Sequence, residues 1–239
     1  MFLIPFYSHH QDGMIIDKKQ GSKFAKEICN DFNPLHDVDN KRFCVPGDLL
    51  FALTLKEYGI SEKMYFSFCE MLPASKPVYF KNDVSHKLEI VDGYGKKYLG
   101  ADVSGGVNNH VGSVKSLILS YVRFSGKNFP NILVPLMAEN RVMINPSRPL
   151  VIYQSMSLAM SQIFFEKVST EIGDALIDIK GNRAKVTLSF TLNSKGKIIG
   201  AGTKNLVIAG VRPYDNELCS KLVNEYVRKR DAYLVSKHA

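Results

Sequence analysis

The 239-residue sequence lacks the features that mark a membrane, secreted or metal-binding protein. Its apolar runs are shorter than the ~18 residues that a membrane-spanning helix needs. The apolar residues 1–6 carry no basic segment and are interrupted by Pro5, so they do not predict a signal peptide. The cysteines form no CxxC pair and no zinc-type spacing; they are Cys29, Cys44, Cys69 and Cys219. We therefore expect a reduced, cytoplasmic protein without a bound metal.

Clustered charge is also scarce, although the formal net charge is +8. Lysine and arginine are spread along the chain, and the densest basic run is Arg228-Lys229-Arg230. No nucleic-acid motif accompanies it, so we do not predict nucleic-acid binding. The surplus fits either an ordinary solvated surface or a diffuse positive field that suits a phosphorylated carrier such as coenzyme A, or an acidic carrier protein.

Apolar patterns in the first half predict two helices followed by strands. Asp17 is placed to cap a helix from about Lys18 to Cys29. A second helix from Pro46 to Tyr58 is apolar nearly all round, which is typical of a buried central helix. Strands are predicted at residues 63–72, 76–84, 86–91, 97–103 and 113–123, with a hairpin loop at 104–110.

A similar order returns in the second half. Helical spacing of apolar residues predicts a helix from Pro149 to Val168, and strands follow at 175–180, 183–192 and 197–211. Helix-then-strands thus occurs twice, which favours an α+β fold built by a diverged duplication. We expect a first unit at 13–125, a connection at 126–148, a second unit at 149–212 and a C-terminal helix at 213–239.

The loop between the first two predicted helices is Asp31-Phe32-Asn33-Pro34-Leu35-His36. Proline disfavours helical geometry in the residue before it, so Asn33-Pro34 ends the preceding helix. The loop holds an acid and a base five residues apart. Gly47 then stands at the mouth of the second helix, where free N–H groups carry a partial positive charge. This combination suits acid–base chemistry on a carbonyl compound.

A family resemblance is carried by the string DFNPLH, with a helix before it and an apolar helix after it. It resembles the motif of the MaoC-like (R)-specific enoyl-CoA hydratases over about residues 22 to 55. Those proteins have the hotdog fold, in which an antiparallel sheet wraps around a long helix. The resemblance implies a tandem (double) hotdog here, with the motif in the first unit only. The stretch RFCVPGDLLFAL also resembles a bacterial family of undefined function.

The resemblance implies a role for each matching residue. Asp31 and His36 match the catalytic pair, with His36 as base and Asp31 as proton donor and water anchor. Gly47 would polarise the thioester carbonyl through its N–H, and Asn33 would shape the substrate-binding loop. Thr54 would stand in for a serine of the family, one register away. No metal or redox cofactor is implied, because coenzyme A or carrier phosphopantetheine arrives with the substrate.

Departures from the family pattern leave alternatives open. Asn30 stands where a small residue is usual, and Pro46 stands where a histidine is common and removes one N–H near the predicted carbonyl site. Asp31 and Asn33 could instead serve only the turn, Gly47 could be ordinary turn chemistry, and the Thr54 hydroxyl could bond its own helix.

The sequence as a whole favours an enzyme that binds acyl thioesters. We expect a hydro-lyase, an (R)-specific 2-enoyl-CoA or enoyl-carrier hydratase or 3-hydroxyacyl dehydratase. An acyl-CoA thioesterase and a non-catalytic acyl-CoA or lipid-binding module are the alternatives. We expect the substrate to be an acyl-CoA or an acyl-carrier thioester, and we expect no stable membrane association. The sequence leaves open whether the protein forms a homodimer.

Overall fold

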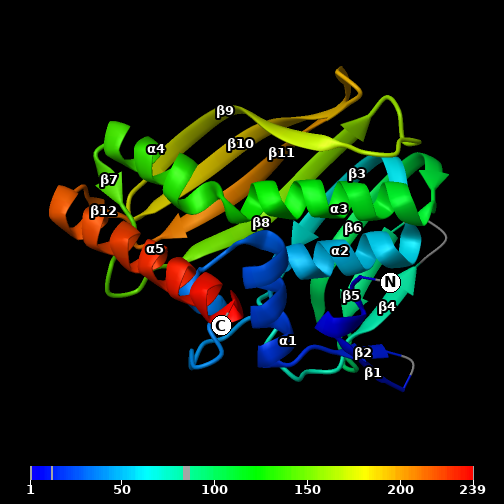
Figure 1. The fold of residues 1–239 in the computed structure, drawn as a ribbon, viewed down its shortest axis with the longest axis horizontal. Coiled ribbons are helices and arrows are strands. Elements are labelled where there is room, and N and C mark those ends of the chain that lie inside the picture. The colour runs from blue at the N-terminus through cyan, green and yellow to red at the C-terminus, as the bar shows by residue number, and fades with distance from the viewer. Residues whose placement is uncertain (1, 12, 83–86, 239) are drawn as a thin grey trace.

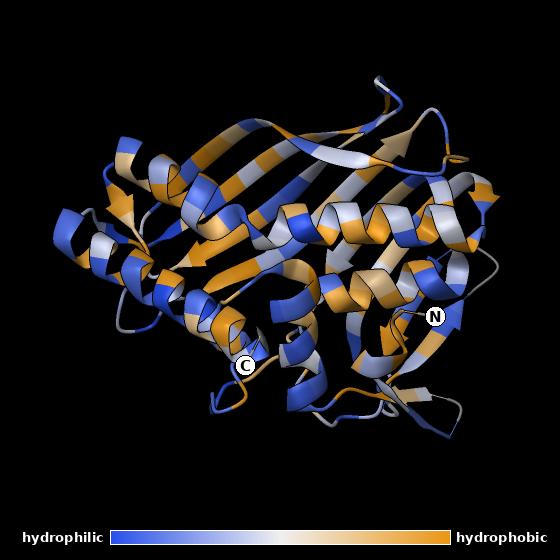
Figure 2. Ribbon diagram, in the orientation of Figure 1, coloured by the Kyte–Doolittle hydropathy of each residue, from blue (hydrophilic) through white to orange (hydrophobic). Residues whose placement is uncertain are grey.

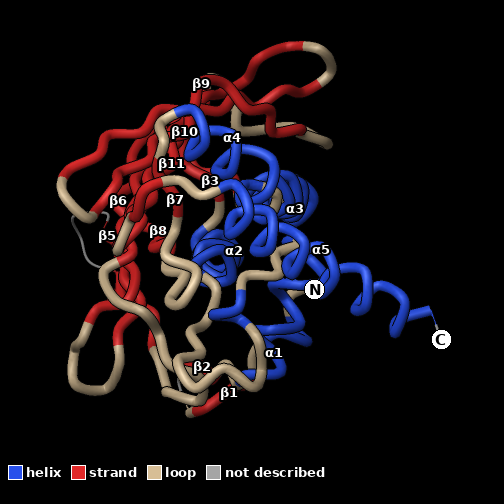
Figure 3. The backbone as a smooth tube through the Cα atoms, turned by 90° about the vertical axis from the view of Figure 1, so that its left-hand side faces the viewer, coloured by secondary structure: helices blue, strands red, loops and turns tan. Residues whose placement is uncertain are grey.

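The protein is a mixed α+β structure in which helices cover one face of a large sheet (Figure 1). The computed structural model describes residues 2–11, 13–82 and 87–238. Seen edge-on in Figure 3, the strands lie on one side, and helices α2 (Gly47–Tyr58) and α3 (Val111–Gly126) lie on the other. The predicted α+β class is therefore confirmed.

The large sheet has eight strands in the order β4-β5-β6-β3-β8-β11-β10-β9, and every neighbouring pair is antiparallel. Their bounds are β3 (Ile60–Phe68), β4 (Tyr79–Asn82), β5 (Lys87–Val91), β6 (Lys97–Asn108), β8 (Val151–Met160), β9 (Ser169–Lys180), β10 (Arg183–Ser194) and β11 (Lys197–Ala209). The order is symmetrical about the β3–β8 pair, where Met64 lies opposite Leu158. From the centre outward, the strands of the first half are β3, β6, β5 and β4, and those of the second half are β8, β11, β10 and β9. In both halves the strand that comes first in the chain lies at the centre, followed by the fourth, the third and the second. The two halves therefore have the same strand order.

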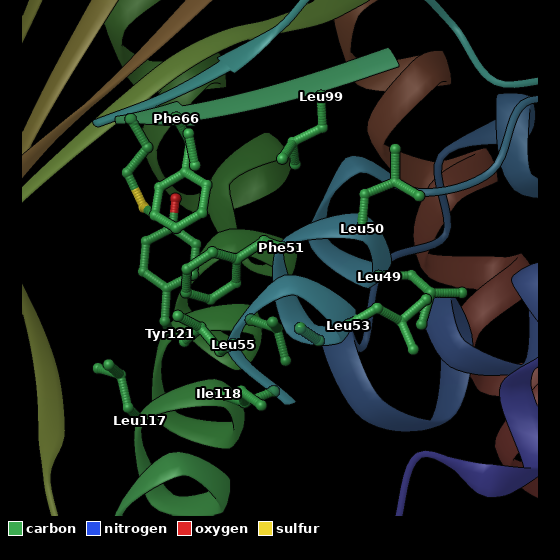
Figure 4. Packing of buried hydrophobic residues seen from close by; sticks show 14 of the residues in the cluster. Leu49, Leu50, Phe51, Leu53, Leu55, Phe66, Leu99, Leu117, Ile118 and Tyr121 are labelled. Atoms are coloured by element: carbon green, nitrogen blue, oxygen red, sulfur yellow. The ribbon is translucent and has the colours of Figure 1, made fainter. Parts of the chain in front are cut away.

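The core lies between this sheet and the two helices α2 and α3. Residues 48 to 55 of α2 are all buried, as its apolar composition predicts. The ring of Phe51 lies 5.1 Å from that of Phe66 on β3 and 4.9 Å from that of Tyr121 on α3 (Figure 4). Figure 2 shows the contrast between the hydrophobic ribbon of α2 and the more hydrophilic terminal helix α5 (Asn216–His238). Asp48, Leu49 and Leu50 in the first turn of α2 are therefore packed inside the fold.

Two predicted elements have the wrong type. Residues 113–123 form part of helix α3 and not a strand, because buried Val114, Leu117, Ile118 and Tyr121 follow a helical period. Residues 151–160 form strand β8 and not a helix. The spacing of four between Met156 and Met160 fits both periods, and the buried Leu158 between them decides for the strand.

The predicted hairpin loop at 104–110 is also wrong. Strand β6 continues to Asn108, because Val107 and Asn108 pair with Ser61 and Ile60 of β3. The remaining predicted strands that lie on described residues are present with shifted ends. The start of the strand predicted at 86–91 and the end of that predicted at 76–84 fall outside the described residues.

The helix predicted at 18–29 consists of α1 (Lys18–Lys23) and a π-helical continuation, Phe24–Cys29. Asp17 and Gln20 form a capping box at its start, as the sequence predicts for Asp17. The predicted connection at 126–148 holds a second π-helical turn, Phe129–Leu133, then α4 (Val134–Glu139) and β7 (Val142–Met143). The division into two units stays a prediction.

Short elements complete the described chain. They are the 3-10 turns Ile4–Phe6 and Pro34–His36 and the strands β1 (Ser8–His10), β2 (Gly13–Ile15) and β12 (Arg212–Pro213). β1 pairs with β2, and β12 pairs with β7. Among the described residues, no helix is both long enough and apolar enough to cross a membrane.

Candidate functional site

The 31–36 loop is shaped by its own side chains. Asn30 ends the π-helical segment in the left-handed conformation, with φ 57° and ψ 37°, which asparagine tolerates better than most residues. The carboxylate of Asp31 accepts from the N–H of Asn33 through Oδ1 at 2.9 Å. The Oδ1 of Asn33 accepts from the N–H of Leu35 at 3.1 Å. The turn role considered for Asp31 and Asn33 is therefore present, and it leaves the second oxygen of Asp31 free for another partner.

That second oxygen faces His36. Asp31 Oδ2 lies 3.8 Å from His36 Nε2, which is too long for a direct hydrogen bond. His36 Nδ1 lies 2.9 Å from the backbone oxygen of Cys44. Because a carbonyl oxygen can only accept, Nδ1 carries a proton and Nε2 is the nitrogen presented to Asp31. The loop thus aims one carboxylate oxygen and one imidazole nitrogen at a common point.

The pair holds a proton at neutral pH. Burial would lower the pKa of His36, but the side chain of Cys44, the negative charge of Asp31 and the backbone oxygen of Cys44 together outweigh burial and raise the pKa to about 9. Burial raises the pKa of Asp31, while the nearby His36 and the N–H of Asn33 oppose that rise. We therefore assign the proton to His36, so that an imidazolium faces a carboxylate.

Both side chains line a pocket of about 620 Å³. Its walls come from the 31–36 loop, the first turn of α2, the end of α3, the start of β8, the inner face of β11 and one side of α5. Asn33, Pro46 and Gly47 line it together with Asp31 and His36. The predicted residues of the loop and of the helix mouth are therefore brought together in space.

Gly47 is the first residue of α2 and lies against two aromatic rings. A Cβ at this position would stand 3.1 Å from Phe68 and 3.2 Å from Tyr153, whose rings stack at 4.0 Å between centroids. The oxygen of Pro46 accepts from the N–H groups of Leu49 and Leu50. The N–H groups of Gly47 and Asp48 precede those and have no acceptor within the helix. Pro46 therefore leaves the first free donors of the helix in place.

Thr54 lies outside this pocket. Its hydroxyl donates to the oxygen of Leu50 at 2.9 Å, and the residue is 1% exposed within the core. The structure therefore corrects the expectation that Thr54 binds substrate, because its hydroxyl is already bonded to its own helix.

Sequence reasoning missed the part played by α5. The hydroxyl of Tyr226 accepts from the N–H of Phe32 at 3.1 Å and lies 3.4 Å from the oxygens of Asn30 and Gly126. Lys229 pairs with Asp37 at 3.1 Å. The contacts with Asn30, Phe32 and Asp37 join residues almost two hundred positions apart, and the contact with Gly126 joins residues 100 positions apart. No local sequence pattern can predict contacts over such separations. The effect of these contacts is to hold the 31–36 loop against the end of α3.

Sequence reasoning also missed a second set of polar side chains in the same pocket. Ser125 donates to Asp48 Oδ2 at 2.5 Å, and Lys204 in turn donates to Ser125. The Lys204 amine also lies 4.3 Å from the ring centroid of Tyr153. Burial lowers the pKa of Lys204, and the charge of Asp48 opposes that change. One feature of the sequence could have indicated it. Lys204 is two and four residues from the buried Leu206 and Ile208, so its side chain lies on the same face of the strand as theirs.

A metal centre finds no support within the described ranges. No group of three or more histidine, cysteine, aspartate or glutamate side chains there is arranged to hold a metal ion. The polar atoms of the pocket are instead those of acid–base and hydrogen-bonding side chains.

Residues 1–217 match the protein family described as "Protein of unknown function (DUF3581)". The chain belongs to this family. No curated protein matches the chain.

Several solved structures match the chain at low identity. An acyl-CoA thioesterase II from Mycobacterium marinum shares 9% identity, with 90% of this chain and 99% of that chain covered and a TM-score of 0.44. A putative thioesterase II from Thermobifida fusca shares 5%, with 84% and 93% covered and a TM-score of 0.46. A MaoC-like dehydratase shares 8%, with 84% and 97% covered and a TM-score of 0.41. Because these TM-scores are below 0.5, we take neither mechanism nor substrate from them.

Proposed function

We propose that this protein binds an acyl thioester in the pocket and adds water across its 2,3 double bond, or removes water from a 3-hydroxyacyl thioester. The proposal rests on one observation: Asp31 and His36 present an oxygen and a nitrogen, 3.8 Å apart, to the same 620 Å³ pocket. A carboxylate and an imidazolium at that spacing can hold one water molecule or one substrate hydroxyl between them.

The proton positions suggest how the pair works. With the pKa of His36 at about 9, His36 is the proton donor and the Asp31 carboxylate is the acceptor. Asp31 takes a proton from the water molecule as the water oxygen bonds to C3 of the acyl chain. His36 Nε2–H gives a proton to C2. A proton then returns from Asp31 to His36, which restores the pair. These roles are the reverse of those expected from the sequence.

The first turn of α2 is suited to the thioester carbonyl. Negative charge develops on that oxygen as the double bond is attacked. The N–H groups of Gly47 and Asp48 are free of helical acceptors and lie at the positive end of the helix dipole. Removal of one donor of this kind typically costs about a hundredfold or more in rate.

The fold is compatible with a tandem hotdog. The strand order is the same in both halves of the sheet, and α2 contacts β3 of the first half while α3 contacts β9 of the second. In this proposal the second half closes the acyl-chain side of the pocket through β8 and β11. Coenzyme A or a carrier phosphopantetheine would remain at the open side as part of the substrate.

The test is a hydration assay with trans-2-butenoyl-CoA. The wild-type protein should consume the enoyl absorbance, and Asp31→Asn and His36→Gln should each lower kcat/KM about a hundredfold or more. Thr54→Val is the matched control, because Thr54 is buried outside the pocket, and it should retain the wild-type rate. Release of free thiol without loss of the double bond would instead assign the pocket to thioester hydrolysis and contradict the proposal.

A further inference from the structure

The pocket contains a second set of polar side chains that the hydration chemistry does not use. We call Asp48, Ser125, Asn128 and Lys204 the polar subsite. All four line the pocket, and each is at least nine-tenths buried, with exposures of 8%, 7%, 4% and 4%. They come from α2, α3, the segment after α3 and β11. Burying such groups is costly, so their convergence on one cavity calls for a physical reason.

Part of the polar subsite is internally satisfied. Lys204 donates to Ser125, and Ser125 donates to Asp48 Oδ2. This chain links the two buried charges through one hydroxyl and makes them neutral as a pair. A carboxylate placed here would add a second negative charge beside Asp48, and an ammonium group would add a second positive charge beside Lys204. The subsite therefore suits an uncharged ligand group.

Three atoms of the subsite have no partner. Asp48 Oδ1 and both amide atoms of Asn128, Oδ1 and Nδ2, are buried without a hydrogen bond to any part of the chain that the structure describes. Asp48 Oδ1 and Asn128 Oδ1 can only accept, and Asn128 Nδ2 can only donate. A ligand that satisfies them must both donate and accept hydrogen bonds. Buried polar side chains are normally paired, so these atoms point to a ligand.

Depth indicates which part of a thioester reaches the subsite. The side chains of Asp31 and His36 are 23% and 11% exposed, whereas the four residues of the polar subsite are each 4–8% exposed as whole residues. A carrier group enters from solvent and occupies the open side of the pocket. With the thioester at Asp31 and His36, the buried side receives the acyl chain.

We propose that Asp48, Ser125, Asn128 and Lys204 bind a neutral hydroxyl or amide group carried on the acyl chain of the substrate. This inference rests on the proposed function, since it assumes that the pocket holds an acyl thioester. It adds a substrate class: acyl chains with an internal polar group in place of plain hydrocarbon chains. A pocket that hydrogen-bonds such a group discriminates strongly against the analogue without it, because its own polar atoms are then left unpaired.

Calorimetric titration with saturated thioesters, which cannot be hydrated, tests the preference. The probes are butanoyl-, hexanoyl- and octanoyl-CoA, each beside its ω-hydroxy and ω-carbamoyl counterpart. At one chain length or more, the hydroxyl or the amide form should bind at least about tenfold more tightly than the plain chain. The hydroxyl and amide series tell the two groups apart. Equal or tighter binding of the plain chains at every length would overturn the inference.

Asn128→Leu should abolish the preference and leave plain chains bound as well as before or better. Asn131→Leu is its control, because Asn131 lies in the π-helical turn that Asn128 precedes but is exposed and outside the pocket. If Asn128→Leu weakens plain and polar chains alike, the amide contacts the carrier arm, and the acyl-chain assignment is wrong.

The melting temperature of the free protein gives a second readout. Asn128→Leu removes two unpaired buried atoms, so it should raise the melting temperature or leave it unchanged. A fall of several degrees with an unaltered ligand preference would show a purely structural role and contradict the inference. If the protein hydrates trans-2-butenoyl-CoA but binds the plain and polar saturated chains equally, this inference alone is refuted. Failure to bind any acyl-CoA refutes the proposed function as well.

Discussion

The pocket contains two sets of polar side chains, one from a single loop and one from elements far apart in the sequence. Asp31 and His36 come from one six-residue loop, and their backbone contacts are mostly local. Asp48, Ser125 and Lys204 come from three elements spread over more than 150 residues, and the hydroxyl of Ser125 links the other two side chains. The first set is built to present its atoms to the pocket. The second set also holds three elements of the fold together. Its loss should therefore lower the free energy of unfolding much more than loss of the first set.

The largest stability effect is expected for Lys204→Met. It leaves the Asp48 carboxylate buried without its compensating charge, which typically costs about 3–5 kcal/mol in the free energy of unfolding. Asp31→Asn keeps an oxygen for the N–H of Asn33 but removes the charge that faces His36, so it should cost about 1–2 kcal/mol. Urea unfolding of the two variants measures the difference.

The double variant Lys204→Met with Asp48→Asn sharpens this comparison. It removes both charges, so it should recover much of the stability that Lys204→Met loses. Equal losses in Asp31→Asn and Lys204→Met would show that the two sets of polar side chains do not differ in the way described.

A smaller effect is expected from pH acting on His36. Its pKa rises from an ordinary 6.5 to about 9 on folding, so its contribution to stability is complete below pH 6.5 and is lost as pH rises through 9. The total loss is about 3–4 kcal/mol, because the two pKa values differ by about 2.5 and each pH unit between them removes about 1.4 kcal/mol. Urea unfolding at several pH values from 6 to 10 measures it. His36→Gln should show a much flatter profile in that window; an identical slope would assign the titration to another group.

The smallest effect is expected for Tyr226→Phe. It takes the acceptor from the buried N–H of Phe32 and should cost about 1–2 kcal/mol. Tyr233→Phe on the same helix is the control, because its hydroxyl bonds a partly exposed glutamate, Glu27, and its loss should change stability by at most about 0.5 kcal/mol. Thermal unfolding compares the two. Equal effects would mean that α5 does not specifically support the 31–36 loop.

Local sequence patterns predicted the parts of the site that are built locally. The turn chemistry of Asn33-Pro34 and the apolar run after Pro46 were sufficient to place the loop and the mouth of α2. They could not place Tyr226 or Lys204, because those contacts depend on how distant elements meet. Nor could they assign β8, where residues four apart fit a helix and a strand equally well.

The pH dependence of butenoyl-CoA hydration tests the central claim most directly, because it asks whether the Asp31–His36 pair carries out the reaction. The wild-type kcat/KM should be constant near neutral pH and fall about tenfold per pH unit above pH 9, where His36 loses its proton. His36→Gln should be slower by about a hundredfold or more and should lack that decline. A His36→Gln variant that hydrates the substrate at the wild-type rate, with the same decline above pH 9, would contradict the account.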